Sequence, residues 1–208
     1  SNIYSGNFEE AYKDLDLNSV IDQWLIWELT MNREYGDPRS VYMFMDGDGK
    51  LCAGPVWDFD RGTFQNQNNA SSLGNSDRIK ADNEWMCWRT QESDSYSYIW
   101  YKKLVTDPIF QQTVKARWAE MKPYLDMMPE LIHIYGETLA LSYKYDSAMW
   151  PTQKGDIQRF KYGFSDWSGD EQLGANGNYQ EVIDNFVTVY QERLNGMDQL
   201  ITSGKFTK

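Results

Sequence analysis

Two carboxylates stand two residues apart in the run Gly-Pro-Val-Trp-Asp-Phe-Asp at residues 54–60. The residues before them have the pattern of a β-strand, so Asp58 and Asp60 are predicted to lie where a strand ends. Carboxylates at positions i and i+2 can present oxygens on one side of a turn, as Mg²⁺ prefers when sites are left for water or phosphate. The aromatic neighbours Trp57 and Phe59 indicate an anchored loop, which favours a metal site over a solvated acidic turn.

Three enzyme classes use acidic residues at a strand end. Phosphatases of the haloacid dehalogenase type need Asp-x-Asp-x-Thr, but Thr63 comes one position late, after Arg61 and Gly62. Those phosphatases and metal-dependent glycosyltransferases also need an alternating β-α series, which this chain does not show. Protein kinases place a loop with an acidic base, then a hairpin, then a metal-binding Asp after the second strand. That order matches this chain.

The elements that must position the carboxylates are a helix and a hairpin. A helix is predicted over residues 17–31, capped by Asp16 or Asn18, because apolar residues recur there at helical spacing. Strands are predicted over residues 41–45 and 50–57, joined by the turn Asp-Gly-Asp-Gly, whose glycines supply positive φ angles.

Glu28 falls in the middle of the apolar stripe of the first helix. An unpaired buried charge is costly, so Glu28 is predicted to be buried with a dedicated partner. We expect that partner to be structural and not catalytic.

The rest of the chain is mostly helical. Helices are predicted over residues 108–121, 129–145 and 179–201, and long loops over residues 65–94 and 150–178. The fold class is therefore α+β and mainly helical. At 208 residues the chain is predicted to form a single domain, residues 1–208.

Composition excludes several classes of function. A formal charge of −11 repels polyanions, so nucleic acid is excluded as a partner, although a nucleotide can still bind through Mg²⁺. No apolar run is long enough to span a membrane. One histidine, His133, cannot build a two-His zinc site, and it is predicted to be a packed or surface residue of a helix. Cys52 and Cys87 allow one disulfide.

Four stretches together resemble one known family. They are residues 16–22 (Asp-Leu-Asn-Ser-Val-Ile-Asp), 27–32 (Trp-Glu-Leu-Thr-Met-Asn), 38–43 (Pro-Arg-Ser-Val-Tyr-Met) and 54–60, of which the last is the most specific. The chain resembles the spore-coat protein H (CotH) kinase family over most of its length. The resemblance implies an atypical protein-kinase-like C-lobe, with a hairpin that carries an acidic metal-binding tip. It also implies binding of ATP with Mg²⁺ or Mn²⁺, and phosphorylation of Ser or Thr in extracytoplasmic proteins. By the same resemblance the chain itself is expected to be extracytoplasmic, in the bacterial cell envelope or secreted.

The resemblance assigns roles to the acidic residues. Asp58 takes the place of the metal-binding Asp, and Asp60 is a second acidic group beside it. The triplet Asn-Arg-Glu at residues 32–34 falls where kinases carry His-Arg-Asp, so Glu34 becomes the catalytic acid/base. Asp37, next to a proline, is the rival base.

Two further residues complete the implied site. Ser40 stands near the asparagine that holds a second metal in kinases, and Arg61 could contact a phosphate. Ser is a weaker metal ligand than an amide oxygen, and Glu34 extends the carboxylate by one methylene. A pseudokinase is therefore an open alternative. The implied upstream lobe with its phosphate-binding lysine does not precede Leu17, so the chain is expected to be the C-lobe-like part of such a kinase or a kinase-like remnant.

An alternative comes from another class of protein. The chain is rich in tryptophan and tyrosine, a composition shared with sugar-binding faces. In this interpretation the chain is a non-catalytic cell-surface module. Its acidic tip binds a cation, and a glycan stacks on aromatic side chains that include Trp85, Trp88, Trp100 and Trp167.

Overall fold

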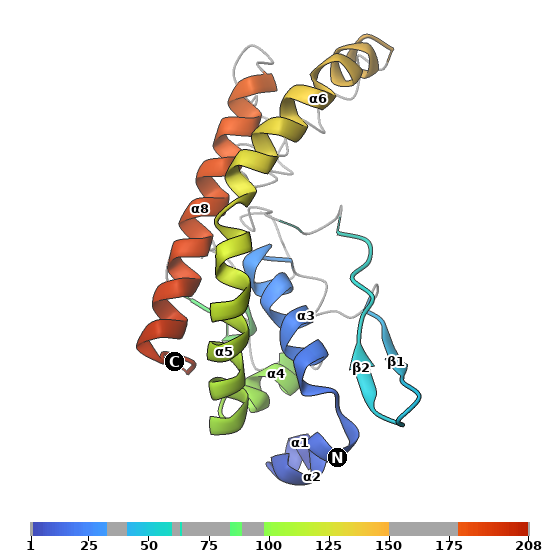
Figure 1. Ribbon diagram of the computed structural model, residues 1–208, viewed down its shortest axis with the longest axis vertical. Helices are drawn as coiled ribbons and strands as arrows, with labels where there is room; N and C mark the ends of the chain where they lie inside the picture. The colour runs from blue at the N-terminus through green and yellow to red at the C-terminus, as the bar shows by residue number, and fades with distance from the viewer. Residues whose placement is uncertain are drawn as a thin grey trace, which may run out of the picture. The chain divides into compact units, whose positions relative to one another are not determined.

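The computed structural model describes residues 2–32, 41–59, 63, 84–88, 98–149 and 179–207, and these residues are mainly helical (Figure 1). The chain forms two compact units. Unit 1 comprises Ser1–Thr63, Asn83–Lys122 and Gly196–Lys208, and unit 2 comprises Phe64–Asp82 and Pro123–Asn195. The expectation of a single domain over residues 1–208 stays a prediction.

Most elements belong to unit 1. In chain order they are α1 (Asn2–Ser5), α2 (Phe8–Asp14), α3 (Leu17–Leu29), β1 (Met43–Met45), β2 (Leu51–Ala53), the 3₁₀-helix η3 (Met86–Trp88) and α4 (Tyr98–Leu104). Helix α6 (Met128–Met149) lies in unit 2, while α5 (Pro108–Leu125) and α8 (Tyr179–Ser203) each contribute residues to both units.

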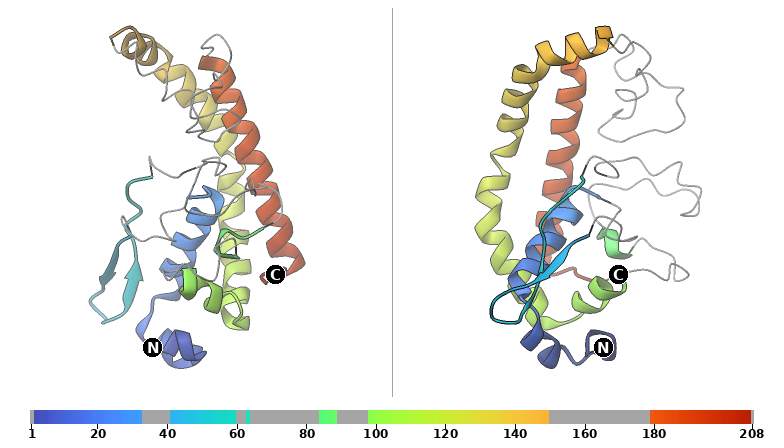
Figure 2. Two further views of the ribbon diagram at one scale, coloured as in Figure 1. Left: turned by 180° about the vertical axis from the view of Figure 1, so that it is seen from behind. Right: turned by 90° about the vertical axis from the view of Figure 1, so that its right-hand side faces the viewer.

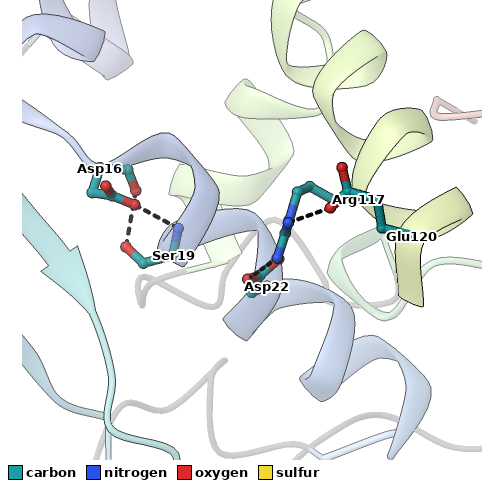
Figure 3. A network of polar contacts seen from close by, with 5 residues as sticks. All are labelled: Asp16, Ser19, Asp22, Arg117 and Glu120. Carbon is teal, nitrogen blue, oxygen red and sulfur yellow. Dashed lines mark hydrogen bonds and ion pairs between the residues drawn. The ribbon is translucent and has the colours of Figure 1, made fainter. Parts of the chain in front are cut away.

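Helix α3 begins at its predicted cap and ends in a Schellman motif. The Asp16 carboxylate accepts a hydrogen bond from the Ser19 amide at 2.7 Å, so the cap is Asp16 (Figure 3). At the other end, the amide of Met31 donates to the carbonyl of Glu28 at 3.2 Å, and the amide of Asn32 donates to that of Trp27 at 3.1 Å. Met31 has a φ of 51°, where glycine is usual. The helix therefore ends two residues before the predicted boundary.

The core of unit 1 is built around α3. Its predicted apolar stripe is buried except for Leu17, which is half-buried, and Trp24 at its centre is fully covered. The Trp24 ring lies 4.9 Å from that of Trp85 and 5.5 Å from that of Phe110. Arg117 of α5 donates to both carboxylate oxygens of Asp22, at 2.8 and 2.7 Å, and so holds α5 against α3 (Figures 1 and 3).

The predicted loop over residues 65–94 contains a short 3₁₀-helix, η3, within the part that the structure describes. Trp85, Met86 and Cys87 are buried, at 2%, 2% and 0% exposure. The indoles of Trp85 and Trp88 donate hydrogen bonds to the carbonyls of Lys205 and Phe206, at 2.7 and 2.8 Å. The loop was predicted from the polar composition of residues 65–94 as a whole, which hides the short apolar run at residues 85–88. This run packs into the core and binds the C-terminal segment.

The hairpin forms as predicted, with shorter strands. β1 and β2 pair antiparallel in the register Met43↔Ala53, Phe44↔Cys52 and Met45↔Leu51. The Asp46 carboxylate closes the turn by accepting from the amides of Asp48 and Lys50, at 3.0 and 2.8 Å. Strand β2 lies beside α3 because the Ala53 amide donates to the Ser19 hydroxyl at 3.0 Å (Figure 2).

The described part of unit 2 consists mainly of α6 and of α8 up to Asn195. The Tyr179 hydroxyl donates to the carbonyl of Gly136 at 3.0 Å, and its ring stacks 4.6 Å from that of Tyr143. Both helices appear where the sequence predicts them. His133 lies on α6, partly exposed and 3.8 Å from Asp184, as expected of a surface histidine. The predicted loop over residues 150–178 lies outside the described residues. Among the described helices, none is long and apolar enough to cross a membrane.

Candidate functional site

A buried carboxylate anchors the end of α3 from which the site begins. Glu28 is 0% exposed. Its Oε2 accepts a hydrogen bond from the Met86 amide at 2.6 Å, and its Oε1 accepts one from the Cys87 amide at 3.2 Å. These amides open η3 and have no partner within that short helix. The prediction of a buried Glu28 with a structural partner is confirmed.

The charge of Glu28 also acts on a neighbouring phenol. Burial, and next the negative charge of Glu28, raise the pKa of Tyr101 above its ordinary value. Tyr101 therefore stays neutral at physiological pH.

The end of α3 is tied to a distant point of the chain. Asn32 is 1% exposed, and its side-chain Nδ2 donates to the Thr63 hydroxyl at 2.9 Å. The Schellman motif fixes the backbone of Asn32, so the amide is presented from a rigid helix end. Thr63 closely follows the predicted metal-binding carboxylates in the sequence.

Asp58 lies beyond the sheet and not at a strand end. The predicted strand over residues 50–57 stops at Ala53, because Gly54 has a φ of 129° and Pro55 carries no N–H for the ladder. The Gly54 amide makes the last hairpin bond, to the Tyr42 carbonyl at 2.9 Å. The chain then continues as a loop to Asp58, whose φ is 63°.

In residues 54–63, which we call the acidic loop, Pro55 to Asp58 are exposed and Phe59 is half-buried. Asp58 is exposed, and Trp57 is 61% exposed, so Trp57 does not anchor the loop as its aromatic character suggested. Instead, the loop is held through the hairpin bond before it and the Asn32–Thr63 bond after it. A left-handed φ is tolerated by Asp better than by most residues, which fits an acidic residue at this position.

Only one predicted site residue can be placed. Asp60, Arg61, Glu34, Asp37 and Ser40 lie outside the described residues.

Whether a metal ion fits at Asp58 depends on the other side chains that could bind it. No cluster of three or more His, Cys, Asp or Glu side chains is found within the described ranges. Mg²⁺ is usually held by one or two carboxylates together with water and substrate phosphates, so an exposed Asp58 fits that role without a protein cage.

The Asn32–Thr63 bond was missed by reasoning from the sequence. Asn32 entered only as the first residue of a kinase-like triplet, and Thr63 only as a displaced phosphatase threonine. No local signal pairs two residues 31 positions apart.

Comparison with models of known protein families shows to which family the chain belongs. The model described as CotH kinase protein matches residues 4–197, nearly the whole chain. The chain belongs to the CotH kinase family. The resemblance inferred from four short stretches is thereby confirmed. Searches of curated proteins and of solved structures gave no match.

Asn32, Asp58 and Thr63 all lie within the region that matches the CotH family model. Trp85 cannot stack on a glycan, as the alternative interpretation requires. It is buried, and its ring stacks on that of Phe206 with ring centroids 5.8 Å apart. Trp88 and Trp100 are partly buried, and Trp167 lies outside the described residues.

The disulfide left open by the sequence does not form in this CotH-family chain. Cys52 and Cys87 are not bonded to each other, and both are buried.

Proposed function

We propose that this chain is the C-lobe-like part of an atypical protein kinase that transfers the γ-phosphoryl group of Mg·ATP, or Mn·ATP, to a Ser or Thr hydroxyl of a protein. The observation that carries the proposal is the CotH kinase match over residues 4–197. The position of Asp58 supports it, since this carboxylate lies on an exposed loop directly after the hairpin, in the chain order that kinases use for a metal-binding Asp.

In this proposal each candidate residue has one role. Asp58 holds the metal, with Asp60 assisting and Ser40 as a further oxygen ligand. When bound, the metal neutralises negative charge on the phosphate oxygens. Arg61 contacts a phosphate group.

The chain's own acid/base residue handles the proton. The substrate hydroxyl oxygen attacks the γ-phosphorus, the bond from that phosphorus to the β,γ-bridging oxygen breaks, and ADP leaves. The hydroxyl proton passes to Glu34, our first choice, or to Asp37. The products are a phosphorylated Ser or Thr and ADP. In keeping with the family, we place the substrate among extracytoplasmic proteins.

The proposal is tested by nucleotide-dependent thermal unfolding of the chain. A ligand that binds only the folded state at about 100 times its Kd adds about 2.7 kcal/mol of stability. Mg·ATP should therefore raise the Tm by several degrees, whereas ATP with EDTA should not. Asp58→Asn should abolish the Mg·ATP shift. A Tm that is the same with and without Mg·ATP contradicts the proposal.

A non-catalytic version makes a different prediction. Ser40 and Glu34 depart from the kinase pattern, and this observation favours a pseudokinase as the second candidate. A pseudokinase would show the same Tm shift with Mg·ATP, but the full-length protein would transfer no phosphate to a Ser- and Thr-rich acceptor.

A further inference from the structure

The Asn32–Thr63 hydrogen bond closes a loop that contains every candidate site residue. Its two residues are 31 positions apart, and the donor–acceptor distance is 2.9 Å. Glu34, Asp37 and Ser40 follow Asn32 in the sequence, and Asp58, Asp60 and Arg61 precede Thr63. One side-chain bond therefore joins the two ends of the segment to which the proposed chemistry is assigned.

The donor side of this bond is rigid. Asn32 is 1% exposed, and its backbone amide is fixed to the carbonyl of Trp27 at 3.1 Å. Met31, which is fully buried, takes the left-handed conformation that turns the chain at this point. Because Asn32 is already held by α3, the hydrogen bond restrains Thr63 and the chain before it.

Helix α3 fixes both ends of the acidic loop. Near its first turn, the Ser19 hydroxyl accepts from the Ala53 amide at 3.0 Å, and beyond its last turn Asn32 holds Thr63. The 13 residues of α3 extend about 20 Å, and the ten residues 54–63 could reach at most about 35 Å. The segment can therefore bridge the two tethers, at Ala53 and Thr63, and Asp58 lies five residues from each of them in the sequence.

We propose that Asn32 is a positioning residue for the acidic loop. It donates to Thr63, touches neither metal nor substrate, and restricts the conformations of the chain that carries Asp58. A restrained loop loses less entropy when a cation binds, so the bond raises the affinity for the metal. This inference rests on the proposed function, since it requires that the acidic loop bind a divalent cation.

Substitutions at Thr63 isolate the bond. Thr63→Val keeps the shape of the side chain and removes the acceptor of the amide, whereas Thr63→Ser keeps the hydroxyl. Tyr12→Phe is the matched control, because it removes a part-buried side-chain bond of 2.7 Å, from Tyr12 to Asp107, away from the acidic loop.

The experiment is a Mn²⁺ titration of the purified chain, with free Mn²⁺ measured by electron paramagnetic resonance and the Tm of every variant measured in parallel. We expect Thr63→Val to weaken Mn²⁺ binding at least fivefold. Thr63→Ser and Tyr12→Phe should stay within twofold of the wild type, even though Tyr12→Phe lowers the Tm. Asn32→Ala should weaken binding as well, and adding it to Thr63→Val should cause little further loss.

Different failures are distinguishable. An affinity of Thr63→Val within twofold of the wild type overturns the role of Asn32 while the metal site stands. Equal weakening by Thr63→Val and Tyr12→Phe also overturns it, because general destabilisation then explains the loss. No Mn²⁺ binding by the wild type overturns the proposed metal site, and this inference with it. If Thr63→Val does not fold, Thr63→Ala removes the same acceptor without placing a methyl group against the amide, and the same limits apply.

Discussion

Glu28 and Met86 are 58 residues apart in the chain, and the carboxylate of one accepts the backbone amide of the other at 2.6 Å. The carboxylate is fully buried and also accepts the next amide, that of Cys87, so it supplies two acceptors to the start of η3. Hydrogen bonds to a charged group contribute about 1.5–3 kcal/mol each, more than neutral ones. These two hydrogen bonds therefore hold the end of α3 that leads into the candidate site to the core of unit 1.

Replacing Glu28 tests this anchor. Glu28→Ala should lower the free energy of unfolding by roughly 2–4 kcal/mol, because two buried amides lose their acceptors. Chemical denaturation measures the loss. Glu9→Ala, at an exposed position of α2, is the control and should change stability by no more than about 0.5 kcal/mol. Equal effects of the two substitutions would show that the Glu28 carboxylate contributes nothing specific.

The metal-binding role of Asp58 is tested by fluorescence. Trp57 is 61% exposed and adjacent to Asp58, so Mg²⁺ or Mn²⁺ should change its emission. Asp58→Asn should abolish that change. Asn tolerates the left-handed φ of 63° as Asp does, so the substitution removes charge without straining the backbone. Trp57→Phe identifies the reporter, and a metal response that survives Asp58→Asn would assign the metal elsewhere.

Gly136 should be required for the close approach of α6 and α8 within unit 2. A Cβ at this position would lie 2.9 Å from Cγ1 of Ile183 and 3.1 Å from its Cγ2. Gly136→Ala should therefore destabilise the chain by about 1–3 kcal/mol, although alanine is the better helix former.

A double-mutant cycle checks the cause. In an Ile183→Ala background the contact is absent, so Gly136→Ala should become neutral or stabilising by up to about 1 kcal/mol. Thermal unfolding of the four proteins measures the coupling. Additive effects would place the clash somewhere other than Ile183.

The identity of the base is tested in the full-length protein. Glu34→Gln should reduce phosphotransfer to a Ser- and Thr-rich acceptor by about 10²-fold or more, with nucleotide affinity little changed, because the base acts on the transferred proton and not on ground-state binding. Asp37→Asn is the paired comparison and should have a smaller effect. A larger loss in Asp37→Asn would move the catalytic role three residues along the chain.

Features set by local interactions could be predicted from the sequence. Asp16 caps α3 through an amide three residues away, and Asp107 caps α5 in the same way, accepting from the Phe110 amide at 2.9 Å. The hairpin follows from the Asp-Gly pairs between two apolar runs. In each case the decisive contacts lie within a few residues, so the pattern and the structure agree.

The candidate site was only partly predictable. The strand before Asp58 ended early, because Gly54 and Pro55 interrupt the ladder, and Trp57 faced solvent instead of anchoring the loop. The family resemblance, which depends on four short stretches, was confirmed by the match to the CotH kinase model.

The sequence by itself determined the helices, the hairpin, the family and the need of Glu28 for a buried partner, because spacing, capping and the cost of an unpaired charge act locally. Only the tertiary structure decided that this partner is the start of η3, and that Asn32 reaches Thr63 across 31 residues. A single sequence carries no signal for such pairs. They form because burial of the surrounding apolar side chains brings the segments together, and the polar groups carried in with them must then find partners.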